Sequence, residues 1–314
     1  MGSTNINQTR NKAKRRSKKR KKSNIEIIIK SILCIAVVYI TFMICIDKQE
    51  KATLNLGLSQ EDNQQETPKE MAQQLAKTEK GEFGDVALIN DNRGVPVICY
   101  HSVVTDKSKK GPIAIPKEIF REQLKTIKDE GYTTLTMAQL NGYLYENKPI
   151  PEKSVVVTFD DGYSDNYTNA FPILKEFNMK ATIFVISSYV NRDLYLTGDE
   201  IKEMSDYGMD IESHTVSHKR LSTMTYEDQL KELKNSKKAI EELTHRTVIS
   251  IAYPEGKYNN NTKKAVVDAG YAMGFTIERG VANRSDNLAQ IQRDCVDYTY
   301  KPNSILNLLK KLKK

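Results

Sequence analysis

The chain has 314 residues, with 48 Lys and Arg against 40 Asp and Glu and a formal net charge of +8. Ten of the basic residues and none of the acidic ones lie in residues 1–24, which leaves 38 basic and 40 acidic residues elsewhere. The excess positive charge is therefore confined to an N-terminal tail, which argues against nucleic-acid binding by the rest of the chain. Four cysteines, two of them inside a hydrophobic run, exclude a disulfide framework.

The hydrophobic run covers residues 25–46 (IEIIIKSILCIAVVYITFMICI) and directly follows the basic tail. Its length is close to the roughly 20 residues that a transmembrane helix needs, and the basic tail predicts a cytoplasmic N-terminus. Because no small-x-small cleavage pattern ends the run, we interpret it as an uncleaved signal anchor, with a cleaved signal peptide as the alternative. The chain beyond residue 46 is then expected outside the cell. A nucleic-acid-binding role for the tail would leave this run unexplained.

Residues 47–93 are polar and weakly patterned, and they predict a flexible extracellular stalk. Residues 94–314 alternate amphipathic helices with short apolar segments, and they predict one large domain. Four helices are expected to end in a left-handed residue: Gly131, Asn178, Gly208 and Gly270. Strands are expected at residues 95–101, 155–159, 181–186, 209–213, 249–253 and 271–276, with a seventh candidate at 291–296.

Strands that are joined through helices pair in parallel by right-handed crossovers. This number of strand–helix units predicts an α/β fold, either a TIM-like barrel or an open doubly wound sheet. In both folds, reactive side chains lie just beyond the carboxyl ends of the strands.

Polar residues end or follow several of these predicted strands: His101, Asp160, Asp161, His214, His218 and Tyr253. Each group has a purely structural explanation. Asp-Asp-Gly is common in turns, two histidines four residues apart can share a helix face, and a single histidine is often half-buried. Their collection at one end of one sheet favours a functional site.

Two imidazoles and one carboxylate can hold a divalent metal ion with positions left open for water. A cation would also offset the repulsion between the adjacent Asp160 and Asp161. One aspartate could bind the metal while the other accepts a proton from water, which predicts a hydrolase. Cys99 and Cys295 are expected as isolated buried thiols, although they could pair if their strands are neighbours.

Three segments resemble the first three motifs of the polysaccharide deacetylases, carbohydrate esterase family 4: TFDDG, HTVSH and AYPEG, which begin at residues 158, 214 and 252. The resemblance implies a distorted (β/α)7 TIM-like barrel in the catalytic domain 94–314. It implies that Asp161, His214 and His218 bind one divalent metal ion, usually Zn²⁺ and sometimes Co²⁺ or Ni²⁺. It also implies that Asp160 is the general base.

The sequence departs from the family pattern in two places. Many members carry an arginine in the third motif, where this chain has Ala252, so Arg293 or Arg279 would have to orient the base. Many members also take the acid from a histidine near the C-terminus, which this chain lacks. His101 in ICYHSV resembles the early histidine of the poly-N-acetylglucosamine deacetylase branch, which implies that His101 is the acid. His245 is expected on the surface.

Tyr253, Glu255 and Tyr163 are expected at substrate and oxyanion positions, with a backbone N–H near Glu255 binding the oxyanion. We therefore expect a membrane-anchored extracellular enzyme that removes N-acetyl groups from peptidoglycan or poly-N-acetylglucosamine. An O-acetyl esterase of the xylan type with the same site and a non-catalytic glycan-binding domain are the alternatives. The expected partners are an acetylated polysaccharide and the membrane, with no nucleic acid. The oligomeric state is left open.

Overall fold

The computed structural model describes residues 83–311. The basic tail, the hydrophobic run 25–46 and residues 47–82 of the predicted stalk lie outside the described residues. Within residues 83–311, no helix has both the length and the apolar character needed to cross a bilayer.

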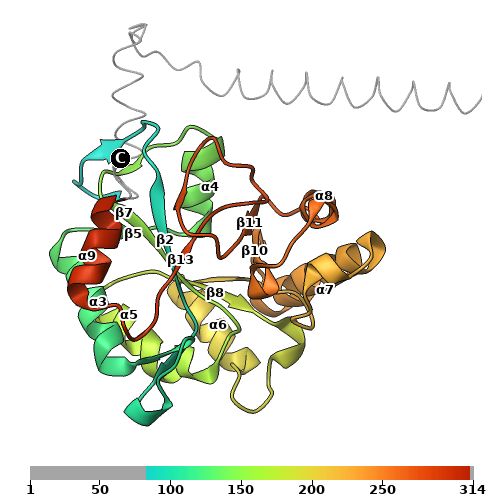
Figure 1. The fold of residues 1–314 in the computed structure, drawn as a ribbon, viewed down its shortest axis with the longest axis horizontal. Helices are drawn as coiled ribbons and strands as arrows, with labels where there is room; N and C mark the ends of the chain where they lie inside the picture. Colours follow the sequence, from blue (N-terminus) through green and yellow to red (C-terminus); the bar gives the residue numbers. More distant parts are fainter. Residues whose placement is uncertain (1–82, 312–314) are drawn as a thin grey trace, which may run out of the picture. The chain divides into compact units, whose positions relative to one another are not determined.

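Seven parallel strands form the centre of the domain, and each matches one of the segments predicted from the sequence (Figure 1). They are β2 (Val95–Tyr100), β7 (Ser154–Phe159), β8 (Thr182–Val185), β9 (Asp210–Ser213), β10 (Ser250–Ala252), β11 (Met273–Phe275) and β13 (Asp294–Cys295).

Six of these strands form one sheet in the order β11-β10-β9-β8-β7-β2, and all neighbouring pairs in this series are parallel. β13 pairs in parallel with β2, through Asp294 with Ile98 and Cys295 with Cys99. Ile291, just before β13, forms a parallel bridge to Phe275 of β11. The sheet therefore curls back toward its own edge, as in the predicted distorted barrel and unlike an open doubly wound sheet. Residues 291–295 form the seam that joins the two edges of the sheet. They make two residue pairs with β2 and one bridge to β11.

Shorter strands lie around this sheet. They are β1 (Leu88–Ile89), β3 (Ser102–Val104), β4 (Ala114–Pro116), β5 (Thr133–Thr134), β6 (Ile150–Pro151) and β12 (Val281–Ala282). β1 falls in the predicted stalk but pairs with β6, so the folded domain begins before residue 94. β12 runs antiparallel to β2, an exception to the expected parallel pairing.

Helices surround the central strands (Figure 1). They are α3 (Lys117–Asp129), α4 (Met137–Tyr145), α5 (Phe171–Glu176), α6 (Gly198–Tyr207), α7 (Tyr226–Thr244), α8 (Asn260–Asp268) and α9 (Pro302–Lys311). α6 shows why the local sequence sets these bounds. Thr197 and Glu200 form a capping box at its start, and Gly208 ends it with a φ of 99°. All four residues predicted to be left-handed at helix ends have positive φ.

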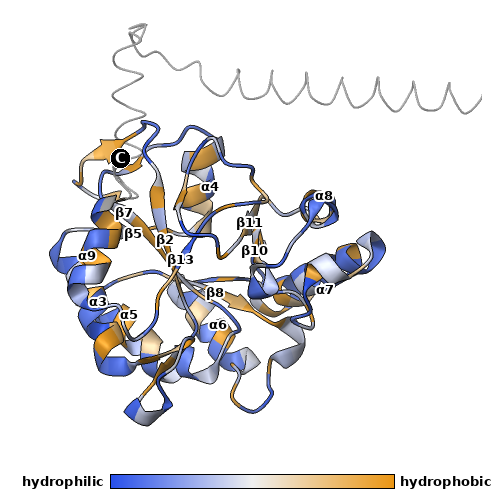
Figure 2. Ribbon diagram, viewed as in Figure 1, coloured by the Kyte–Doolittle hydropathy of each residue, from blue (hydrophilic) through white to orange (hydrophobic). Residues whose placement is uncertain are grey.

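Buried side chains of the central strands alternate between two clusters, as strand geometry requires. In β2, Ile98 and Tyr100 belong to the cluster that packs against the helices, whereas Val95 and Val97 belong to the other. The second cluster joins Phe184, from another part of the curled sheet, to side chains of α4, so it fills the interior and packs against that helix. Figure 2 shows the central strands coloured as hydrophobic and the helices in mixed colours. Both faces of the sheet are therefore buried, as expected for parallel strands.

Candidate active site

The turn after β7 places two carboxylates at the carboxyl end of the sheet. Asp160 and Asp161 follow Phe159 directly, and Asp161 has a φ of 73°, a conformation that non-glycine residues rarely adopt. Gly162 also has a φ of 73°, and a Cβ there would lie 3.0 Å from the Val185 side chain. Left-handed residues of this kind are costly and concentrate at functional sites.

Asp161, His214 and His218 face one another across this end of the sheet. The Asp161 Oδ1 lies 3.5 Å from His214 Nε2 and 3.3 Å from His218 Nε2. One ligand atom from each residue lies within 4.8 Å of those of the other two. Asp161 is 8% exposed and His214 is 2% exposed, so this is not a solvated surface cluster.

The donor set fits a divalent metal ion. His214 Nδ1 lies 2.8 Å from the Ala252 carbonyl oxygen, so this nitrogen carries the proton and donates it. Nε2 is thereby left with its lone pair facing Asp161, which is the arrangement of metal-ligating histidines in proteins. Two imidazoles and a carboxylate are a common ligand set for Zn²⁺.

The two histidines lie on a loop rather than on a helix. This loop follows β9, and positive φ values at Thr215 and His218 fold it back on itself. The carboxylate of Glu232 on α7 accepts hydrogen bonds from the N–H groups of Val216 and Ser217. The shared direction of the imidazoles therefore comes from this turn and its anchoring glutamate.

Arg293 provides the partner of Asp160 that the third motif lacks. Its Nη1 and Nη2 each lie 2.8 Å from an Asp160 oxygen, and both side chains are almost fully buried. Arg293 Nε also donates to the Thr276 carbonyl, and its guanidinium packs over Phe184. Arg279, the alternative candidate, is 74% exposed and lies near Asp294 instead.

The carboxylates of the site are held in their charged form. Burial would raise the pKa of Asp160, but the charge of Arg293 outweighs it and lowers that pKa to about 2. Burial acts in the same direction on Asp161, and the neighbouring imidazoles of His214 and His218 outweigh it and lower that pKa. Both groups are therefore ionised at neutral pH.

His101 directly follows β2 and lies beside Asp160. Ligand-type atoms of Cys99, His101 and Asp160 lie within 4.8 Å of one another. Asn166 Nδ2 donates to the His101 carbonyl at 2.6 Å, which fixes the chain at this point. Burial lowers the pKa of His101, opposed by the nearby Asp160 and Asp161. His245 lies far along the chain at the end of α7 and is exposed, as predicted.

The three residues predicted at substrate positions lie in different environments. Tyr163 is half-buried and stacks on Tyr195, with ring centroids 5.3 Å apart. Glu255 is exposed, has a φ of 55° and binds Arg220 through its carboxylate. Tyr253 is fully buried and donates to the Ala289 carbonyl at 2.8 Å. A substrate contact by the Tyr253 side chain is thus not supported, because the ring packs inside the domain.

Cys99 is a neighbour of the site that the motifs did not indicate. Its thiol donates to Asp160 Oδ2 at 3.5 Å. The signal was present in the sequence, because Cys99 precedes His101 by two residues on a predicted strand, and such residues share a face.

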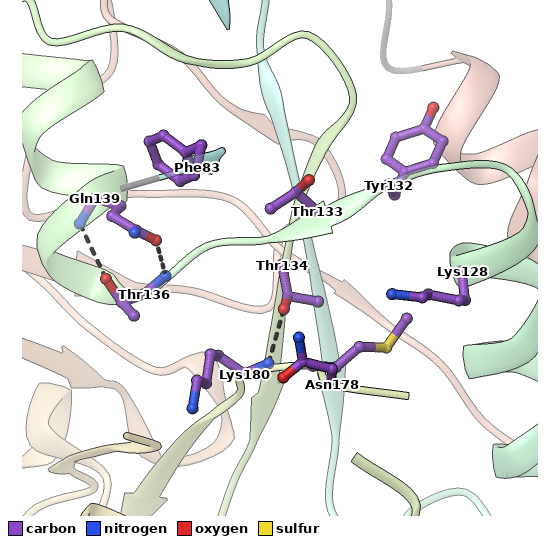
Figure 3. Close-up of a pocket in the computed structure, with 10 residues that line it drawn as sticks. Phe83, Lys128, Tyr132, Thr133, Thr134, Thr136, Gln139, Asn178 and Lys180 are labelled. Carbon is purple, nitrogen blue, oxygen red and sulfur yellow. Dashed lines mark hydrogen bonds between the residues drawn. The ribbon is translucent and has the colours of Figure 1, made fainter. Parts of the chain in front are cut away.

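A pocket of about 340 Å³ lies elsewhere in the domain (Figure 3). Its lining includes Thr133 and Thr134, which pair with Ser154 and Val155 at the start of β7. It therefore opens near the amino ends of the strands, whereas Asp160 and Asp161 follow the carboxyl end of β7. None of the site residues described above lines this pocket.

Comparisons with known proteins agree with this geometry. The family model of polysaccharide deacetylases matches residues 147–274. YxkH of Bacillus subtilis, a candidate polysaccharide deacetylase, is 40% identical over 199 residues, which cover 63% of this chain and 70% of YxkH. The poly-beta-1,6-N-acetyl-D-glucosamine N-deacetylase of Escherichia coli is 25% identical, and the match covers 62% of this chain but only 35% of that protein.

Among solved structures, the Streptococcus pyogenes deacetylase PplD in complex with acetate superimposes with a TM-score of 0.67 and 30% identity. The match covers 70% of this chain and 99% of PplD. Family motifs, overall identity and fold thus agree. The chain belongs to the polysaccharide deacetylase family and is a hydrolase of that class.

Proposed function

We propose that this protein is a metal-dependent N-deacetylase that releases acetate from N-acetylglucosamine residues of a bacterial cell-wall or surface polysaccharide. The single observation that carries the proposal is that the two adjacent aspartates in the turn after β7 have different partners. Asp161 completes a metal-ligand set with His214 and His218, while the adjacent Asp160 stays outside that set, bound to Arg293. Similarity to a poly-N-acetylglucosamine deacetylase supports the substrate class, and the acetate in PplD supports the product.

Asp161, His214 and His218 would hold the metal, for which we propose Zn²⁺, with Co²⁺ or Ni²⁺ as replacements. When bound, the ion would supply Lewis-acid polarisation of the acetyl carbonyl and activation of water. The charged Asp160 takes a proton from the attacking water, and Arg293 holds both of its oxygens in place. His101, beside Asp160, delivers a proton to the departing amine nitrogen from its protonated form, which burial disfavours and the charges of Asp160 and Asp161 favour. The loop that contains Glu255 and the ring of Tyr163 would contact the sugar.

We further propose that residues 25–46 anchor the protein in the cell membrane, with the catalytic domain outside. The basic tail before this run and the polar segment after it support a signal anchor and a stalk. A domain on a stalk can reach an insoluble polymer, which suits a cell-wall or surface substrate.

Acetate release from several polymers tests the proposal. The full-length protein should release acetate from N-acetylglucosamine oligomers or peptidoglycan, lose this activity with chelator, and regain it with zinc. Asp160→Asn should lower the rate about 10²- to 10⁴-fold without changing the bound zinc. An unchanged rate would remove Asp160 from the mechanism. Faster release from acetylated xylan would identify an O-acetyl esterase instead.

The acid assignment has a separate test. His101→Ala should slow hydrolysis of amides far more than that of activated acetyl esters, because an ester leaving group needs less protonation. Equal losses on both substrates would contradict the role of His101.

A further inference from the structure

The seam of the curled sheet holds two cysteines opposite each other. Cys99 of β2 and Cys295 of β13 are direct partners in the parallel register. Neighbouring strands lie about 4.8 Å apart, which falls within the range of Cα separations that a disulfide requires. Both thiols are free in the structure. The strand positions thus already meet the main geometric requirement for a bond between them.

The two thiols differ in access and reactivity. Cys99 is fully buried, whereas Cys295 is half-buried. The neighbouring Cys99 side chain lowers the pKa of the Cys295 thiol despite its partial burial. Arg293 acts in the same direction. A thiolate is the nucleophile in thiol exchange, so the accessible cysteine is also the more reactive one.

The pair also touches the machinery of the site. The Cys99 thiol donates to Asp160 Oδ2. His101 follows Cys99 by two residues, just beyond the end of β2, and Arg293 precedes Cys295 by two, just before the start of β13. A bond between the cysteines would therefore link the segment of the proposed acid to the segment that holds the base.

We propose that Cys99 and Cys295 form a reversible disulfide that closes the seam between β2 and β13 and slows turnover at the adjacent Asp160. The effect on turnover rests on the proposed function, whereas formation of the bond does not.

The chemistry balances with a small-molecule or protein disulfide as the oxidant. The Cys295 thiolate attacks one sulfur of that disulfide and releases the other as a thiolate, which leaves a mixed disulfide on Cys295. The Cys99 thiol loses its proton to the released thiolate and attacks the Cys295 sulfur, which expels the second thiolate. Two electrons pass from the cysteine pair to the oxidant.

Two changes at Asp160 would follow. The disulfide has no S–H group, so Asp160 Oδ2 loses the hydrogen bond from Cys99. The bond would also tie β13 to β2 at this residue pair, which restricts the movement of Arg293 relative to Asp160 and His101. Only two residue pairs join these strands in the reduced protein, so a covalent bond at one of them adds a strong new constraint.

Peptide mapping of the full-length protein tests the bond directly. After incubation with oxidised glutathione, a linked peptide containing Cys99 and Cys295 should appear and should vanish with reducing agent. The melting temperature should rise by at least about 5 °C on oxidation, because the bond closes a long loop. Free thiols at both positions, or a glutathione adduct on Cys295 that never resolves, would overturn the proposal.

A second test measures kcat of the oxidised and reduced protein, with Cys295→Ser as the control that cannot form the bond. The oxidised wild type should lose several-fold in kcat and recover on reduction, whereas Cys295→Ser should respond to neither treatment. A linked peptide without any change in kcat would overturn the effect on turnover. An inactive reduced protein that still forms the linked peptide would instead count against the proposed function, so the two failures can be told apart.

Discussion

At the carboxyl ends of the strands, Asp160 is buried beside Arg293 and Asp161 beside two imidazoles, whereas the carboxyl groups of Asp210 and Glu212 on β9 are hydrogen-bonded to backbone N–H groups. Asp210 accepts from the Met137 N–H at 2.6 Å, and Glu212 accepts from the N–H groups of Ile249 and Ser250. Burial raises the pKa of Asp210 to about 6 and that of Glu212 well above its ordinary value. The pKa values of Asp160 and Asp161 are lowered instead.

This contrast separates two uses of a buried carboxyl group. A backbone amide donor satisfies one oxygen but does not compensate the loss of solvation of a charge, so the group favours its neutral form. An arginine or histidine partner stabilises the charged form and keeps it available to accept a proton or bind a cation. The structure therefore has charged carboxylates at the proposed site and carboxyls with raised pKa where they only join elements.

The largest effect is expected from a substitution that breaks the buried ion pair between Arg293 and Asp160. Arg293→Met leaves Asp160 buried without its partner and should lower the free energy of unfolding by about 3–5 kcal/mol. Denaturant titration measures the loss. Adding Asp160→Asn removes the unpaired charge and should restore part of the stability. Equal stability of the single and double variants would show that Asp160 is not destabilised by losing Arg293.

Zinc should stabilise only a protein with an intact ligand set. At a free concentration of about 100 times Kd, a ligand that binds only the folded state adds about 2.7 kcal/mol to its stability. Thermal unfolding with and without zinc should show this gain in the wild type and not in His214→Ala. His245→Ala, an exposed histidine outside the site, is the matched control and should behave as wild type.

The pH dependence of stability tests the raised pKa of Asp210. The pKa of Asp210 is raised in the folded state, so its contribution is complete below its unfolded value near 3.8 and is lost as pH rises through about 6. Ionisation of Asp210 should therefore lower the free energy of unfolding by about 1–3 kcal/mol between about pH 4 and pH 8. Asp210→Asn should flatten that part of the curve, and an identical slope in both proteins would refute the shift. Asp160 does not interfere, because its pKa near 2 leaves it charged throughout this range.

The smallest expected effect concerns an exposed pair at the same end as the buried one. Arg220 and Glu255 form an ion pair with both side chains largely in solvent. Exposed pairs contribute little because water and salt screen them. Glu255→Gln should leave the melting temperature unchanged within error, in contrast to Arg293→Met. A loss comparable to that of Arg293→Met would show that exposure does not distinguish the two pairs.

Much of the site could be predicted from local sequence because its residues follow strands directly. Hydrophobic segments, helix ends and the positions of His101, Asp160 and His214 depend on neighbours a few residues away. The parallel order of the strands then follows from the helical connections. The identity of Tyr253 as a core residue could not be predicted, because its environment depends on Ala289, which lies far along the chain.

The sequence by itself determined the alternating strands and helices, the ends at which polar residues collect, and the family motifs. Only the tertiary structure decided that Arg293, and not Arg279, pairs with Asp160, and that Cys99 lies opposite Cys295. These partners are more than a hundred residues apart in the chain, and nothing in the local pattern specifies which distant residue the curled sheet brings near. Closure of the sheet through residues 291–295 makes that choice, because it carries Arg293 into the interior beside the turn after β7.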